Sequence, residues 1–198
     1  MLLERGLVKR VLASGYSIAL VDLINLFRCG TKGSNLAERP LLMDLVLGMD
    51  CVLRKSKFWP VYFADKCLTD VSRSVLRIEA ERFDACAKTF RLWRKFQSFA
   101  QILSCGGNSD DSEAERLERR ADPFLLSELE NLVEIWQDHV RLPLIISCDK
   151  YRDWSKAFPI ATANRDENDV PALVVPFTVK GRTLEIPKLG IRSWCWSR

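Results

Sequence analysis

The chain has 198 residues, of which 47% are hydrophobic and 28% are charged. This length fits one domain with a substantial core, and the sparse Gly and Pro residues exclude fibrous and largely disordered classes. A formal net charge of +4 permits a polyanionic partner without requiring one.

The seven cysteines are scattered, and no two have the C-x-x-C spacing of a zinc knuckle. The single histidine, His139, has no cysteine pair beside it, so structural zinc is not expected. An odd number of cysteines in a chain with this much core also argues against a disulfide framework. We therefore expect an intracellular protein of a reducing compartment, with cytoplasm, nucleus and mitochondrion all left open. No apolar run reaches the length of a membrane span, so no membrane partner is expected.

The first residues, 1–15, combine Arg5, Lys9 and Arg10 with apolar residues. This pattern fits either an ordinary N-terminal helix or an amphipathic targeting extension. The domain proper is expected to occupy residues 16–198.

Buried strands and amphipathic helices alternate through this domain. Continuous apolar runs such as Ile18–Val21 are typical of strands buried on both faces, whereas apolar stripes at steps of three and four indicate helices. The alternation predicts an α/β fold with a mostly parallel central sheet and helices on both faces. Strands are predicted at 16–22, 59–65, 101–105 and 142–148, and helices at 40–55, 71–99, 123–136 and 151–158.

A polar segment and a C-terminal pair of strands complete the predicted organisation of the chain. Residues 106–120 are polar and charged, which predicts a loop or an exposed helical lead-in. Asp122 and Pro123 then have the residue types of an N-cap and a first helical position. Near the end, residues 172–178 and 182–186 predict a C-terminal hairpin or two edge strands.

Four aspartates lie at or near the ends of the predicted strands and helices. Asp22 ends the first strand, Asp149 follows the strand at 142–148, Asp122 caps a helix, and Asp153 lies four residues after Asp149. Ligands of open α/β sheets bind beyond the carboxyl ends of the strands, so these carboxylates can meet at one sheet edge. Clustered carboxylates raise one another's pKa, and a divalent cation relieves that repulsion. Mg²⁺ and Mn²⁺ prefer oxygen ligands and can activate a water for phosphodiester cleavage.

The sequence around these aspartates resembles a known family. Ile18–Phe27 (IALVDLINLF) resembles the opening strand of NYN domains, the PIN-like ribonucleases. Leu144–Asp153 (LIISCDKYRD) is similar to a segment shared by the Regnase group and the protein-only RNase P nuclease domains, and it is the most specific match. Arg120–Leu126 (RADPFLL) resembles the Asp-Asp-x-Phe helix start of the Regnase group. The tail from Phe177 to Trp194 is loosely similar to the end of the protein-only RNase P nuclease domain, and the whole resemblance covers about residues 16–196.

This resemblance implies a domain of PIN/NYN type that cleaves RNA endonucleolytically in RNA processing or decay. It also implies one or two Mg²⁺ or Mn²⁺ ions as cofactors. Carried over position by position, the metal ligands would be Asp22, Asp122, Asp149 and Asp153, with Asn25 orienting the first carboxylate or a phosphate.

Basic residues are expected to flank the acidic cleft and to contact the phosphates of RNA, single-stranded or structured. Arg152 is expected to pair with a carboxylate or a phosphate. The tail aromatics Trp194 and Trp196 either stack on bases or, as we favour, pack against the sheet edge. The other candidate RNA-binding residues are Lys88, Arg91, Lys95, Arg116, Arg119 and Arg120.

Departures from the family pattern leave a second reading open. Asp110 and Asp111 are an alternative to Asp122 as the acidic ligand, although they would need a longer excursion of the chain. These departures support an alternative function, in which a catalytically degenerate NYN domain serves as an RNA- or protein-binding subunit of a larger ribonucleoprotein. A metal-dependent phosphatase is disfavoured, because no nucleophile motif of that class is present. The three departures are Leu23 where Gly is usual, Cys148 where Asn is common, and Ala121-Asp122 in place of two acids.

Overall fold

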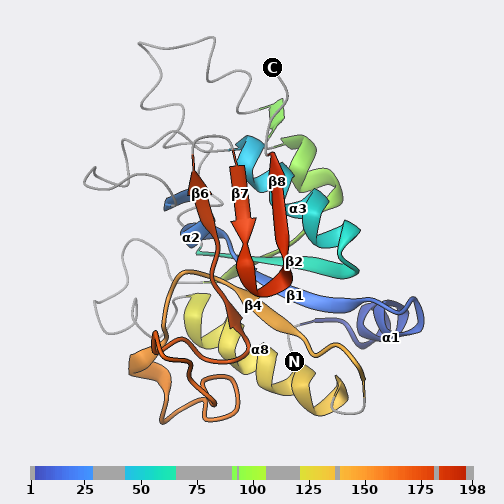
Figure 1. The fold of residues 1–198 in the computed structure, drawn as a ribbon. Coiled ribbons are helices and arrows are strands. Elements are labelled where there is room, and N and C mark those ends of the chain that lie inside the picture. The colour runs from blue at the N-terminus through green and yellow to red at the C-terminus, as the bar shows by residue number, and fades with distance from the viewer. Residues whose placement is uncertain are drawn as a thin grey trace, which may run out of the picture.

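The computed structural model describes residues 3–28, 43–65, 91–92, 94–105, 121–136, 139–180 and 183–194. These residues form a central five-stranded parallel sheet with the order β3-β2-β1-β4-β5 and a separate three-stranded antiparallel sheet (Figure 1). The predicted α/β class with a mostly parallel central sheet is therefore confirmed.

The strands of the central sheet lie close to their predicted positions. The first three match within two residues, whereas the fourth is shorter because pairing with β1 is limited to three residues. Their bounds are β1 (Ser17–Asp22), β2 (Phe58–Asp65), β3 (Gln101–Cys105), β4 (Leu144–Ile146) and β5 (Val174–Val175).

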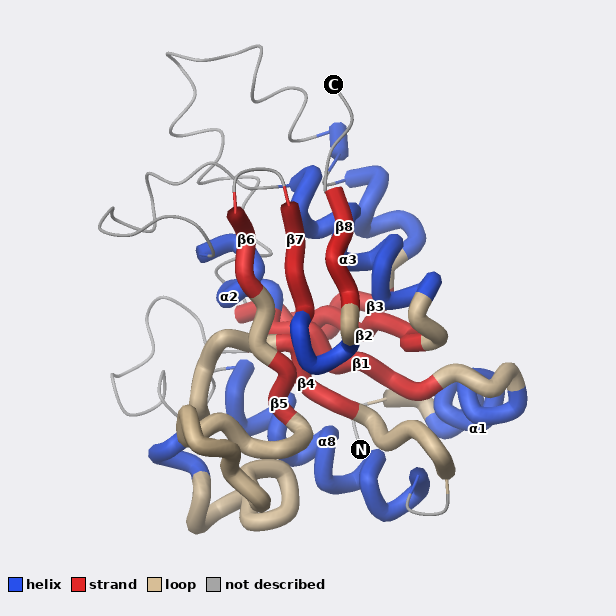
Figure 2. The backbone as a smooth tube through the Cα atoms, viewed as in Figure 1, coloured by secondary structure: helices blue, strands red, loops and turns tan. Residues whose placement is uncertain are grey.

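Helices cover both faces of the central sheet, and each face has its own hydrophobic core. Alternate residues of β1 face opposite sides: Ala19 and Val21 join one core, and Ile18 and Leu20 join the other. Figure 2 shows α8 on one side of the sheet and α3 on the other, together with the three-stranded sheet. The described helices are α1 (Arg5–Ala13), α2 (Leu23–Arg28), α3 (Met43–Lys55) and α8 (Ala121–Trp136), and residues 91–92 and 94–99 are also helical.

The N-terminal residues pack into the same core as α8. Val8 and Val11 of α1 are buried there, with 3% and 2% of their surface exposed. The backbone N–H of Leu3 also donates to the buried carboxylate of Glu128, with 3.2 Å between nitrogen and Oε1. No helix among the described residues is long and apolar enough to cross a membrane.

The C-terminal part contains two strands more than predicted. The expected strand at 172–178 is divided: β5 pairs in parallel with β4 at the edge of the central sheet. After Pro176, which has no N–H for a sheet hydrogen bond, the chain enters the antiparallel sheet. The strands of that sheet are β6 (Thr178–Lys180), β7 (Thr183–Ile186) and β8 (Ile191–Trp194), with the short helix η4 (Pro187–Leu189) between the last two.

Two predicted helix features are wrong. The helix at 151–158 is only a single 3-10 turn, η3 (Arg152–Trp154), because Tyr151 adopts a left-handed conformation with φ of 49°. Asp122 lies within the first turn of α8 and does not cap it, since Ala121 is already helical. The predicted helix over 71–90 and the predicted loop over 106–120 lie outside the described residues.

Candidate functional site

The candidate site lies at the carboxyl ends of β1 and β4. These neighbouring strands pair Val21 with Ile146. The chain leaves β1 for β2 on one side and returns to β4 on the other, so this edge is the switch point of the sheet. Open α/β sheets bind ligands at such a point, which places Asp22 and Asp149 where a ligand is expected.

Asp22 ends β1 and also caps the short helix that follows. Its Oδ1 accepts a hydrogen bond from the backbone N–H of Asn25 at 3.0 Å, as an N-cap carboxylate does. The side-chain amide of Asn25 donates to Oδ2 of the same carboxylate. The predicted role of Asn25 in orienting Asp22 therefore agrees with these contacts. With 3% of its surface exposed, Asp22 is a buried carboxylate held in one orientation.

Ser147 connects the carboxylate of Asp22 to the turn that carries Asp149. Its hydroxyl donates to Oδ2 of Asp22 at 3.2 Å and accepts from the backbone N–H of Asp149 at 3.0 Å. Ser147 is fully buried directly after β4. The two acidic residues are thus tied together through one hydroxyl group.

Tyr151 is buried and contacts both acidic residues. Its hydroxyl donates to Oδ2 of Asp22 at 3.5 Å, and its backbone N–H donates to Oδ1 of Asp149 at 3.1 Å. Burial raises the pKa of Tyr151 well above its usual range, the charges of Asp22, Asp122 and Asp149 add to the rise, and a hydrogen bond with Ser147 opposes it. Asp22 and Asp149 are therefore joined a second time, through Tyr151.

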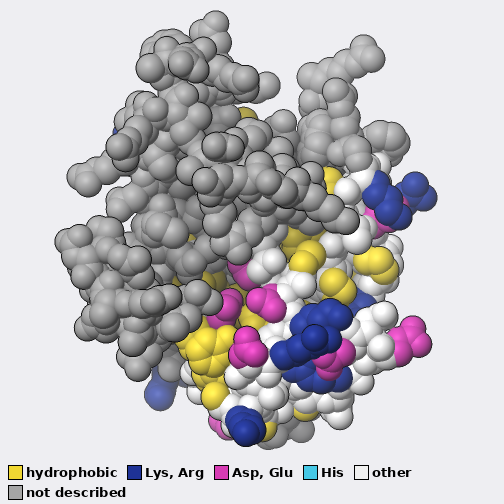
Figure 3. Space-filling model, turned by 90° about the vertical axis from the view of Figure 1, so that its left-hand side faces the viewer, with side chains coloured by type: hydrophobic (Ala, Val, Ile, Leu, Met, Phe, Trp, Pro, Cys, Tyr) yellow, Lys and Arg dark blue, Asp and Glu magenta, His cyan; other side chains and the backbone are white. Residues whose placement is uncertain are grey.

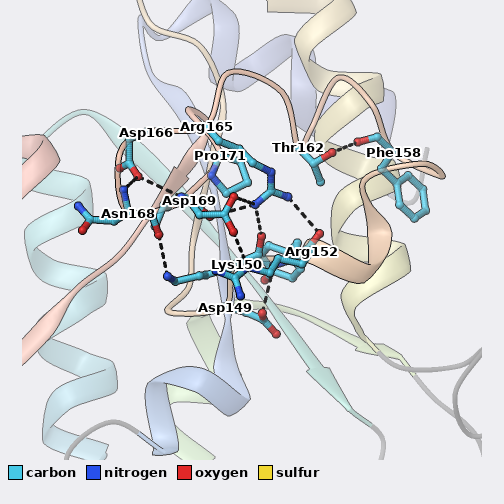
Figure 4. Close-up of polar contacts among 12 residues, drawn as sticks. Asp149, Lys150, Arg152, Phe158, Thr162, Arg165, Asp166, Asn168, Asp169 and Pro171 are labelled. Carbon is cyan, nitrogen blue, oxygen red and sulfur yellow. Dashed lines mark hydrogen bonds and ion pairs between the residues drawn. The ribbon is translucent and has the colours of Figure 1, made fainter.

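Arg165 fastens the turn that carries Tyr151 (Figure 4). Its guanidinium donates to the carbonyl oxygens of Lys150, Tyr151 and Asp169, at 3.0, 3.4 and 2.9 Å respectively, and also to the Asp169 carboxylate. The Asp169 carboxylate also accepts a hydrogen bond from Arg152, and this contact is the main reason that the pKa of Asp169 lies below its usual range. Arg165, from a later part of the loop between β4 and β5, therefore helps to hold the left-handed backbone of Tyr151.

Asp166 organises the other end of this loop. Its Oδ1 accepts the backbone N–H groups of Asn168 and Val170, and its Oδ2 lies 3.6 Å from Nζ of Lys188. The hydrogen bond from Val170 is the largest of the contacts that lower the pKa of Asp166. The loop from β4 to β5 is therefore ordered by two carboxylates at its surface.

The remaining predicted site residues are either exposed at the surface or lie outside the described residues. Asp153 is exposed on η3 and does not have the one-turn helical relation to Asp149 that the sequence suggested. Arg91 and Lys95 are exposed on a helical segment, and Arg152 pairs with Asp169. Lys88, Arg116, Arg119, Arg120, Asp110, Asp111 and Trp196 lie outside the described residues, as does the side chain of Trp194 at the end of β8.

Opposite charges share the surface near the site. Asp149, Arg152 and Asp153 are all exposed and follow one another closely in the chain. Figure 3 shows a face of the molecule on which acidic side chains gather next to a group of Lys and Arg side chains. Such a surface can contact a phosphate through its cations while its carboxylates attract a metal ion.

The three departures from the family pattern have different consequences. Leu23 is fully buried in the core beside α3, so its side chain is not at the surface of the site. Ala121 is also buried. Cys148 is exposed, and its Sγ lies 3.3 Å from the carbonyl oxygen of Phe177. Of the side chains of Leu23, Ala121 and Cys148, only that of Cys148 is exposed.

The donor chemistry fits a hard divalent cation, but the spacing does not form a ready-made cage. Within the described part of the chain, no group of three metal-ligating side chains lies close enough to hold an ion. Mg²⁺ commonly keeps several waters and binds through one or two carboxylates plus substrate phosphates. Asp22, Asp122 and Asp149 match that looser requirement in their chemistry.

Three residues of the site were missed by the sequence reasoning. Ser147 lies two residues before Asp149 in the segment Leu144–Asp153, at a position where the similar family has Ser or Thr. A signal for it was therefore present. Tyr151 is an aromatic residue inside a charged stretch, which is a weaker signal. Arg165 is distant from the motif in sequence and carried no signal, because only the folded loop brings it to Tyr151.

No protein-family model matches the chain, and comparisons with curated proteins and with solved structures found no significant match either.

Proposed function

We propose that this protein is a metal-dependent endoribonuclease of PIN/NYN type, which hydrolyses phosphodiester bonds of RNA. The observation that carries the proposal is the link between Asp22 and Asp149, through Ser147 and Tyr151, at the switch point of a parallel sheet. Carboxylates gathered at this edge are costly without a cation, which favours a metal ion at the site.

The residues proposed to hold Mg²⁺ or Mn²⁺ are Asp22, Asp122 and Asp149, with Asp153 as an outer acid on η3. A bound divalent ion would supply an activated water and would stabilise the charge that develops on the phosphodiester. Asn25 and Ser147 act on the protein side, because their hydrogen bonds hold the Asp22 carboxylate in one orientation. An active site loses activity when its acidic groups can turn away from the productive orientation.

Contacts to the RNA backbone are proposed for three exposed cations of the described residues, Arg152, Arg91 and Lys95. Arg152 lies between Asp149 and Asp153 in the chain and is 62% exposed, so it can reach a phosphate while it pairs with Asp169. Arg91 and Lys95 are further exposed cations. Phosphate contacts make affinity fall steeply with salt, which gives the RNA contact a simple signature.

The deciding experiment measures cleavage of a labelled single-stranded RNA and of an RNA hairpin by the purified chain. We expect cleavage with Mn²⁺ or Mg²⁺ and none with EDTA. Asp149→Asn removes a full negative charge from the site but keeps the Oδ1 acceptor for the backbone N–H of Tyr151. This variant should therefore lose most activity while unfolding at nearly the same temperature.

The matched control is Glu134→Gln, which makes the same change in charge on the exposed part of α8. It should leave cleavage unchanged. Equal activity of Asp149→Asn and the wild type, or cleavage that persists in EDTA, would overturn the proposed mechanism.

The second candidate is a degenerate NYN domain that binds RNA or protein without cleaving RNA. One observation favours it: four hydrogen bonds from Asn25, Ser147 and Tyr151 converge on Asp22. A carboxylate has about four lone-pair positions, so these donors occupy much of its capacity. Salt-sensitive RNA binding without cleavage in either metal would identify this candidate.

A further inference from the structure

A groove of about 690 Å³ lies at the opposite end of the central sheet from Asp22. It is bounded by the residues that lead into β2, β4 and β5, by the end of α3 and by η4. We call it the basic groove, and its lining residues include Lys55, Lys57, Arg141, Leu142 and Leu189. Since β1 runs from one end of the sheet to the other, a ligand in the basic groove does not touch the candidate metal site.

Cations surround the basic groove, and no Asp or Glu is among its lining residues. Lys55, Lys57 and Arg141 are exposed. The fourth cation, Lys188, is engaged with the carbonyl oxygens of Pro171 and Val174 and with Asp166. Three exposed cations therefore set the charge of the groove.

Two of these cations are already oriented by the fold. One guanidinium nitrogen of Arg141 donates to the carbonyl oxygen of Ser56 at 2.5 Å, just beyond the end of α3. The ammonium group of Lys57 lies 5.0 Å from the centre of the Tyr16 ring. The hydrogen bond to Ser56 uses one N–H of Arg141. A guanidinium has five N–H donors, so the other donors can bind another acceptor. The side chains are thus ordered without being neutralised by a carboxylate of the groove lining.

The floor of the basic groove is apolar. Leu142 is 40% exposed there. Pro143, Leu144 and Leu173 continue the apolar lining. The lining therefore combines apolar side chains with a rim of cations, which suits a ligand that carries both acidic and apolar groups.

We propose that the basic groove binds a short acidic segment of a partner protein. Its carboxylates would pair with Lys55, Lys57 and Arg141, and its apolar side chains would cover Leu142 and the groove floor. This inference goes beyond the proposed nuclease function and does not depend on it.

A protein segment fits better than the other polyanions. Single-stranded nucleic acid is held by cations together with aromatic faces on which bases stack. The aromatic residue of this groove is Phe58, which is only 6% exposed and lies 5.9 Å from the Arg141 guanidinium. Inorganic phosphate would use the cations but leave the apolar floor uncovered. An alternation of acidic and apolar side chains matches both halves of the lining.

The test uses the full chain and a fluorescent synthetic peptide in which glutamate and leucine alternate. Binding is measured by anisotropy and located by the amide NMR shifts of Phe58, Leu142 and Leu173. Two variants probe the two kinds of lining residue: Lys55→Glu/Lys57→Glu reverses two of the three exposed charges, and Leu142→Ser removes the exposed apolar contact. Each should weaken binding by about tenfold, and higher salt should weaken it further.

The control variant is Lys9→Glu/Lys156→Glu, which makes the same charge change at exposed lysines outside the groove lining. It should bind the peptide like the wild type. The proposal is overturned if the peptide shifts no groove amides, if a lysine–leucine peptide binds equally well, or if neither groove variant weakens binding. Oligouridylate that binds the same amides more tightly than the peptide would identify the groove as an RNA surface instead.

Discussion

The Tyr151 hydroxyl donates to the carboxylate of Asp22 at 3.5 Å, although 129 residues separate the two in the chain. The contact requires the left-handed backbone of Tyr151, because this conformation turns the chain immediately after Asp149. The raised pKa of the Tyr151 phenol keeps it neutral and able to donate at physiological pH. A neutral donor therefore helps to balance a buried negative charge that the candidate site depends on.

Tyr151→Phe tests this contact directly. The substitution keeps the ring in the core and removes only the donor to Asp22. We expect the free energy of unfolding to fall by about 1 kcal/mol, since the hydrogen bond is long and Asp22 retains other donors. Urea denaturation measures the change, and Tyr16→Phe, at a half-buried tyrosine, is the control with an expected change within about 0.5 kcal/mol. Equal stability of Tyr151→Phe and the wild type would show that the contact contributes nothing.

The two buried tyrosines also predict a loss of stability in alkali. Burial is the main cause that raises the pKa of both Tyr62 and Tyr151, and the nearby carboxylates of Asp50 and Asp22 add to it. In the unfolded chain a tyrosine ionises near pH ~10. The native state then binds more protons than the unfolded state, so stability is full below that pH and declines as pH rises above it.

This alkaline effect is measured by thermal unfolding between neutral pH and the highest pH at which unfolding is reversible. The double variant Tyr62→Phe/Tyr151→Phe should show a flatter decline than the wild type, because it lacks both titrating groups. Parallel declines of the two proteins would contradict the prediction and would assign the loss to other groups.

Leu23→Ala tests whether the bulk of this residue belongs to the core or to the site. Leu23 is fully buried, so its truncation should cost about 2–5 kcal/mol through lost burial and a residual cavity. Leu142→Ala, at a side chain that is 40% exposed, is the matched control and should cost much less. Chemical denaturation of both variants decides the point. A near-neutral Leu23→Ala that gained RNA cleavage would instead place the side chain against substrate.

Arg165→Gln tests how the turn around Asp149 is held. The change removes hydrogen bonds to the carbonyl oxygens of Lys150, Tyr151 and Asp169, and we expect a loss of about 1–3 kcal/mol. Amide hydrogen exchange should rise most at the turn around Tyr151. Arg152→Gln is the control, because its ion pair with Asp169 lies at the exposed surface, where such pairs contribute little to stability. Faster exchange spread evenly over the domain would mean that Arg165 supports global stability and not this turn.

Local sequence patterns were sufficient for the central parallel sheet. The continuous apolar run at Ile18–Val21 indicated a strand buried on both faces, and β1 is buried along its whole length. The alternation of such strands with amphipathic helices predicted the parallel sheet, because each layer must bury its apolar side against the next. The same rule placed Asp22 and Asp149 at one edge of the sheet. All of these are properties that short segments carry by themselves.

Tertiary structure decided the features that depend on residues distant in the chain. Charged and aromatic residues at 151–154 have no strong local preference, and the η3 turn forms where the predicted helix fails because Arg165 and Asp149 hold Tyr151 in a left-handed conformation. Leu23 offered no local sign of whether it faced the core or a ligand, and packing beside α3 buried it. The basic groove likewise exists only because Lys57, Arg141 and Leu189 come from separate segments. Hydrophobic periodicity acts over a few residues, whereas hydrogen bonds and packing between remote segments arise only when the chain is folded.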